Sequence, residues 1–200
     1  MADTAPYSPT TSTRQHSGLR LGLTAMVMVA AVAHLAWEHF NGGIVSHQLL
    51  NRDDLPAISN AWGLVLLPAL TWFAIGRVEK RVALHSGGKG TAPKLPLTVI
   101  IGFLGPLVLG ILLSVAFSND YETMAASLFL GMFVLALLLP VYRAECLLGF
   151  VLGMTFTFGA VLPTLIGSVV AAVSAVVHLG IRPLLVWLWH RFIRPKSVPA

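Results

Sequence analysis

The segment Cys146–Ile181, CLLGFVLGMTFTFGAVLPTLIGSVVAAVSAVVHLGI, contains no Asp, Glu, Lys or Arg. A helix needs about 20 mostly apolar residues to cross the hydrocarbon core of a bilayer, which is about 30 Å thick. The segment is therefore too long for one crossing and long enough for two. Pro163 and the pair Gly167-Ser168 are residue types that favour turns, so we expect one helix before them and another after them.

The rest of the chain is similarly apolar. Of its 200 residues, 56% are hydrophobic and only 10% are charged, whereas soluble domains carry about 25% charged residues. One domain of this size cannot bury so much apolar surface in a single core. The composition predicts an all-α, polytopic membrane helix bundle with the lipid bilayer as its partner. No nucleic-acid partner is expected, because the basic residues lie in short runs without interleaved aromatic residues.

Charged residues divide the chain into six expected spans within one transmembrane domain, residues 19–192. A tail rich in Ser, Thr and Pro, residues 1–18, precedes this domain, and a second tail, residues 193–200, follows it. The first tail lacks an apolar pattern, which is typical of disorder. The six spans are expected at about residues 21–39, 57–76, 97–117, 123–142, 146–166 and 168–189.

The distribution of Lys and Arg predicts the orientation of these spans. Of the 13 basic residues, all but Arg52 and Arg182 lie on the side that carries both termini. Because basic residues are enriched in cytoplasmic loops, both the N-terminus and the C-terminus are expected in the cytoplasm. The charge bias and the compact size favour a bacterial inner membrane as the location.

The first span has a second interpretation. Arg14 and Arg20, an apolar run and then Ala31-Val32-Ala33 follow the order of a secretory signal with its cleavage site. Cleavage there would leave five spans. The apolar run continues beyond the cleavage site, which favours a retained membrane span.

Ionisable and amide side chains gather where the first two spans reach the outer membrane face: His34, Glu38, His39, His47, Asp53, Asp54 and Asn60. His34 and Glu38 are four residues apart, so they share one helix face. The glycine pair after Asn41 is expected to end this helix. Imidazole and carboxylate groups are ligands that Zn, Fe and Cu prefer.

This outer cluster predicts a metal or substrate site of a membrane hydrolase or oxidase that uses Zn, Fe or Cu. The expected metal ligands are His34, His39 and His47. The expected catalytic groups, as ligand or general base on a metal-activated water, are Glu38, Asp53 and Asp54, with Asn60 in contact with substrate. The spacing of His34, Glu38 and His39 is not a specific metal signature, so a structural role for the cluster stays open.

A second polar set lies on the cytoplasmic side of the last two spans. Arg182 at the centre of a membrane span would cost about 2.5–3.5 kcal/mol without a partner. We expect Glu145, at the start of the fifth span, to form a structural ion pair with it. Pro183 should free a backbone carbonyl nearby. A small transporter or channel that uses His178 and Arg182 is the alternative function.

Small residues suggest a third function. Gly149 and Gly153 are four residues apart on the fifth span, a spacing that lets two helix backbones approach closely. A non-catalytic accessory subunit, or a homo-oligomer, would use these glycines to bind a membrane partner. Cys146 is the only cysteine, so no intramolecular disulfide is expected.

Overall fold

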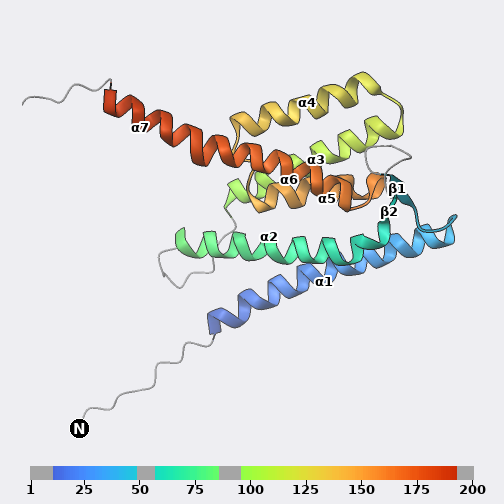
Figure 1. Cartoon of the computed structure of the whole chain (residues 1–200). Coiled ribbons are helices and arrows are strands. Elements are labelled where there is room, and N and C mark those ends of the chain that lie inside the picture. The colour runs from blue at the N-terminus through green and yellow to red at the C-terminus, as the bar shows by residue number, and fades with distance from the viewer. Residues whose placement is uncertain (1–10, 49–56, 86–95, 193–200) are drawn as a thin grey trace, which may run out of the picture. The chain divides into compact units, whose positions relative to one another are not determined.

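The computed structural model describes residues 11–48, 57–85 and 96–192 (Figure 1). It is 87% helical, which confirms the all-α prediction. Four of its helices are long and apolar enough to cross a membrane. The chain forms two compact units, Met1–Pro96 and Leu97–Ala200, and each is described by itself.

The first unit is a pair of helices, α1 and α2, joined by a short β-hairpin and one turn of 3-10 helix, η2 (Figure 1). In the hairpin β1 pairs antiparallel with β2, and Ser46 lies opposite Ser59. The elements of this unit are α1 Thr11–Phe40, β1 Ser46–Gln48, β2 Ala57–Ser59, η2 Asn60–Trp62 and α2 Gly63–His85.

Glycine ends α1 as the sequence predicts. Gly42 and Gly43 adopt φ angles of 124° and 105°, which residues with a Cβ rarely adopt. Asn41 adds a bond from its side-chain Nδ2 to the carbonyl of Trp37, at 2.8 Å. The chain therefore turns sharply out of α1 and enters β1.

The two helices of this unit are linked by a contact far from the β-hairpin. The Nε of Arg20 in α1 donates to the carbonyl of Trp72 in α2 at 3.0 Å. The Arg20 guanidinium also lies 3.8 Å from the centre of the Trp72 indole. Arg20 therefore fixes the register of α1 against α2 through both a hydrogen bond and a cation–π contact.

The second unit contains four helices and a C-terminal extension of the fourth. The α6 helix continues without a break through a π-helical turn, η3, into α7, as one helical rod of 32 residues (Figure 1). The elements are α3 Leu97–Ser118, α4 Glu122–Leu138, α5 Ala144–Phe158, α6 Val161–Ala175, η3 Val176–Ile181 and α7 Arg182–Phe192.

Glycines pack α3 closely against α5. A Cβ on Gly110 of α3 would lie 2.7 Å from the carbonyl oxygen of Phe150 in α5, which is too close for real atoms. A Cβ on Gly149 or Gly153 would likewise overlap α3 backbone. The glycine face that the sequence suggested for an outside partner is therefore buried within this chain.

The turn between the fifth and sixth helices differs from the sequence prediction. We expected it at Pro163 to Ser168, but α5 ends at Phe158 and α6 begins at Val161. Gly159 makes this turn, with φ 66° and ψ −174°. Pro163 is accommodated in the first turn of α6, where a missing N–H is tolerated because that N–H has no partner within the helix.

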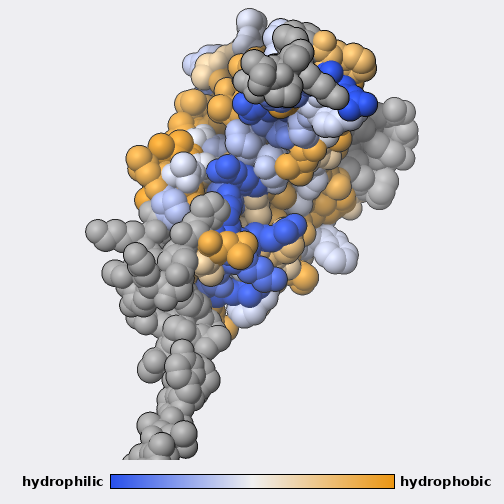
Figure 2. Space-filling model, turned by 90° about the vertical axis from the view of Figure 1, so that its left-hand side faces the viewer, coloured by the Kyte–Doolittle hydropathy of each residue, from blue (hydrophilic) through white to orange (hydrophobic). Residues whose placement is uncertain are grey.

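Some of the described helices are long enough to cross a membrane, and others are shorter than a usual crossing. The four helices long enough to span are Gly18–Phe40, Asn60–Leu84, Leu97–Ser118 and Val161–Phe192. The α4 and α5 helices are apolar but have only 17 and 15 residues, fewer than the usual crossing of about 20. Large apolar side chains lie on the surface beside hydrophilic ones, which suits contact with lipid (Figure 2).

Candidate functional site

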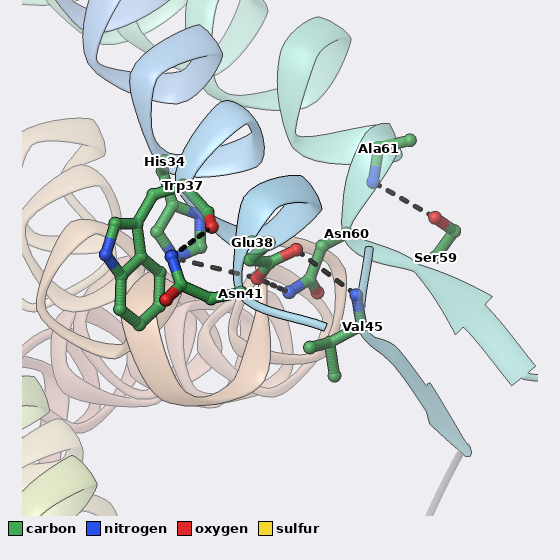
Figure 3. A network of polar contacts seen from close by, with 8 residues as sticks. All are labelled: His34, Trp37, Glu38, Asn41, Val45, Ser59, Asn60 and Ala61. Carbon is green, nitrogen blue, oxygen red and sulfur yellow. Dashed lines mark hydrogen bonds and ion pairs between the residues drawn. The ribbon is translucent and has the colours of Figure 1, made fainter. Parts of the chain in front are cut away.

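The carboxylate of Glu38 is the centre of the polar cluster at the end of α1 (Figure 3). Its side chain is only 5% exposed. The side-chain Nδ2 of Asn60 donates to Oε1 at 2.6 Å, and the backbone N–H of Val45 donates to Oε2 at 3.2 Å. Glu38 therefore accepts hydrogen bonds from two segments that follow α1, and both hold it in one orientation.

His34 lies one helical turn before Glu38 and faces the same carboxylate (Figure 3). Its Nε2 is 3.7 Å from Oε1 of Glu38, which is beyond hydrogen-bonding distance. Two donors on one tetrahedral zinc ion, each about 2.0–2.1 Å from the metal, lie roughly 3.3 Å apart. The observed 3.7 Å is longer than this and lies within the range of a histidine–carboxylate ion pair.

The local backbone explains why these groups meet. After α1 ends, the N–H of Gly43 bonds to the Glu38 carbonyl at 3.0 Å and turns the chain back toward this residue. The N–H of Asn60 then bonds to the carbonyl of Val45, also at 3.0 Å. Val45 and Asn60 therefore hold each other through their backbones, while both donate to Glu38.

The structure brings together three of the residues that the sequence predicted for this site: His34, Glu38 and Asn60. His39 is exposed, and its ring makes an edge-on contact with Phe40 at 5.5 Å between ring centres. His47 lies in β1 opposite Ile58. Asp53 and Asp54 lie outside the described residues. Within the described parts of the chain, no three His, Cys, Asp or Glu side chains gather as metal ligands.

Two features of the site were not apparent from the sequence. The N–H of Val45 is a backbone group and has no residue-type signal. Asn60 was expected to contact substrate, whereas its amide donates to Glu38. The glycine pair after α1 offered a partial signal, because a sharp turn there returns the chain toward Glu38.

The second polar set is not assembled as expected. Glu145 is 3% exposed in the first turn of α5, beside Gly102 of α3, whereas Arg182 is exposed at the start of α7. Because the turn lies at Gly159, the residue level with Glu145 on the antiparallel helix is about Ser174. Arg182 is two turns further along, about 12 Å at 1.5 Å per residue. The register therefore separates the expected partners.

His178 lies within the π-helical turn η3. Its Nδ1 is 3.0 Å from the carbonyl oxygen of Ser174, one turn earlier. Its ring centre is 6.3 Å from that of Tyr142. Ser174 itself is completely buried and donates its hydroxyl to the carbonyl of Leu139 at 3.0 Å. These contacts link α6 and η3 to the segment between α4 and α5.

Comparison of the chain with protein-family models, with curated proteins and with solved structures finds no match.

Proposed function

We propose that the chain is an integral membrane protein that binds a Zn, Fe or Cu ion through His34 and Glu38. The ion would serve a hydrolytic or oxidative reaction at the extracytoplasmic membrane surface. One observation supports this proposal above the others: a buried carboxylate, fixed by two donors, faces an imidazole 3.7 Å away on the same helix, and both groups are of the kinds that these metals prefer as ligands.

The hydrogen bonds to Glu38 leave some of its acceptor positions unfilled. A carboxylate has about four acceptor positions, and Asn60 and Val45 occupy two of them on Glu38. A hydrogen bond to a ligating carboxylate orients it and tunes the metal, which is the role we assign to Asn60. In this proposal His47 supplies a further ligand, and Asp53 accepts the proton of a metal-bound water.

Elemental analysis of protein purified without chelators tests the proposal. We expect near-stoichiometric metal in the wild type and a large loss of metal in His34→Ala. His39→Ala is the matched control, because His39 is an exposed histidine on the same helix that faces Phe40. Wild-type protein that stays folded and metal-free after Zn, Fe and Cu have each been offered would refute the metal site.

We further propose six crossings with both termini cytoplasmic, in a bacterial inner membrane. Cysteine labelling tests the orientation of α1 and α2 in a Cys146→Ala background. Ile44, between α1 and β1, and Leu84, near the end of α2, are both exposed, so each provides a labelling position. An impermeant maleimide should label Ile44→Cys on intact cells, and Leu84→Cys only after permeabilisation; the reverse pattern would contradict the orientation.

The π-helical turn supports one alternative function, transport through His178. Such turns occur frequently at functional sites, because they interrupt the regular hydrogen bonding of a helix. If this alternative is right, His178→Ala should abolish ion flux in proteoliposomes without unfolding the chain, while His34→Ala should leave flux unchanged. Flux that depends on His34 and not on His178 would instead implicate the outer cluster.

A further inference from the structure

We propose that α7 is an interfacial helix that lies along the cytoplasmic bilayer surface and binds anionic lipid headgroups. This inference rests on the proposed orientation, with α7 on the cytoplasmic side, and does not depend on the metal site. It follows from the length of the last helical rod, the side-chain pattern of α7 and the irregular backbone that precedes it.

The combined length of α6 and η3 is enough for one membrane crossing. The α6 helix has 15 residues and η3 has 6, so together they extend roughly 30 Å, the thickness of the hydrocarbon core. This stretch, Val161–Ile181, contains no Asp, Glu, Lys or Arg. Since the turn at Gly159 lies earlier than the sequence predicted, the crossing is complete near Ile181. The 11 residues of α7 then lie beyond it.

The surface of α7 carries many exposed apolar side chains. Leu185, Leu188, Trp189 and Phe192 follow the i, i+3, i+4, i+7 spacing that places side chains on one helix face. None of the described α7 residues is buried, and Phe192 is 77% exposed. If α7 projected into water, this face would have no apolar partner. Lipid at the membrane surface would cover it.

Basic residues lie at both ends of α7. Arg182, His190 and Arg191 are the ionisable residues of α7, and two of them are always cationic. By helical geometry His190 and Arg191 lie more than 90° away from the centre of the apolar face. Three further apolar side chains are exposed on the other faces of α7: Leu184, Val186 and Trp187. This helix is therefore apolar around most of its circumference, and its basic residues lie at its two ends. Basic residues beside an apolar membrane segment attract anionic lipid surfaces.

The backbone before α7 permits a change of direction. The N–H of Arg182 bonds to the carbonyl of Val177, five residues earlier, instead of the usual four. Pro183 follows and has no N–H to donate. Sharp helix bends occur at π-helical turns and prolines, and both are present here within one turn of each other. In this structure α6, η3 and α7 form one continuous helix; in a bilayer, a bend at this position would lay α7 on the surface.

Site-directed spin labelling tests the proposal in full-length protein with the Cys146→Ala substitution, reconstituted into vesicles. Labels at Leu185→Cys and Trp189→Cys should be accessible to oxygen and protected from a water-soluble nickel complex. Labels at His190→Cys and Arg191→Cys should show the opposite behaviour. A steady change of depth along α7 would instead indicate a crossing, and uniform exposure to nickel a helix in water; either result would overturn the proposal.

Lipid composition tests the charge component. Protection at Trp189→Cys should increase, on the order of twofold, when phosphatidylglycerol is added to phosphatidylcholine vesicles. Leu130→Cys, at an exposed apolar position of α4, is the control and should be lipid-embedded in both compositions. Equal protection of Trp189→Cys in both vesicles would refute specific attraction to anionic headgroups.

Discussion

Replacing Asn60 with Ala should destabilise the pair of helices α1 and α2. Its Nδ2 donates to Oε1 of Glu38 at 2.6 Å, and both side chains are buried. A hydrogen bond to a charged group contributes about 1.5–3 kcal/mol, and a buried carboxylate that loses a donor is costly. We expect the free energy of unfolding to fall by about 2 kcal/mol, which is about 30-fold in the equilibrium constant.

The assay is reversible unfolding in mixed micelles, followed by tryptophan fluorescence. Asn41→Ala is the matched control, because Asn41 also donates through Nδ2, at 2.8 Å to the Trp37 carbonyl, but on the exposed surface. Its loss should change the free energy of unfolding by no more than about 0.5 kcal/mol. Equal effects of the two substitutions would show that burial of the Glu38 bond has no energetic importance.

A double-mutant cycle separates this bond from other effects of the substitution. In a Glu38→Gln background the acceptor is neutral, so Asn60→Ala should cost about 1 kcal/mol less than in the wild type. An unchanged cost in both backgrounds would refute the assignment of the stabilisation to the Asn60–Glu38 bond.

Three further changes test the packing. Gly149→Ala should lower stability by about 1–3 kcal/mol, because the new Cβ would overlap the backbone of α3; a thermal melt measures this. Gly131→Ala is its control: a Cβ added there would have no atom within 4 Å, so stability should hold or rise by up to about 1 kcal/mol. Thr71 is 2% exposed, and its hydroxyl oxygen has no hydrogen-bond partner among the described residues. Thr71→Val should therefore leave the unfolding midpoint unchanged or raise it, and a marked fall would contradict this account of the hydroxyl.

Much of the site was predictable because it depends on local spacing. His34 and Glu38 are four residues apart in a helix, so they must share a face wherever the helix lies. The glycine pair after Asn41 fixed the end of α1 in the same way. The donors to Glu38 were less predictable, since they depend on the path of the chain through the β-hairpin.

The position of the turn at Gly159 was not predictable from residue types alone. Pro163 and Gly167 favour turns in general, but proline is also suited to the first turn of a helix. Gly167 packs closely instead, since a Cβ there would lie 2.6 Å from Leu147. The misplaced turn shifted the register of the last two helices, and for this reason the expected pairing of Glu145 with Arg182 failed.

Calorimetric titration of zinc into detergent-purified, metal-stripped protein tests the central claim most directly. The account predicts one zinc ion per chain in the wild type, at least about tenfold weaker binding in Glu38→Gln, and about 10–100-fold weaker binding in Asn60→Ala, which loses a hydrogen bond to the ligand. His39→Ala should bind as the wild type does. Equal zinc affinity in Glu38→Gln, or a folded wild-type protein that binds none of zinc, iron and copper when each is titrated, would contradict a metal site at His34 and Glu38.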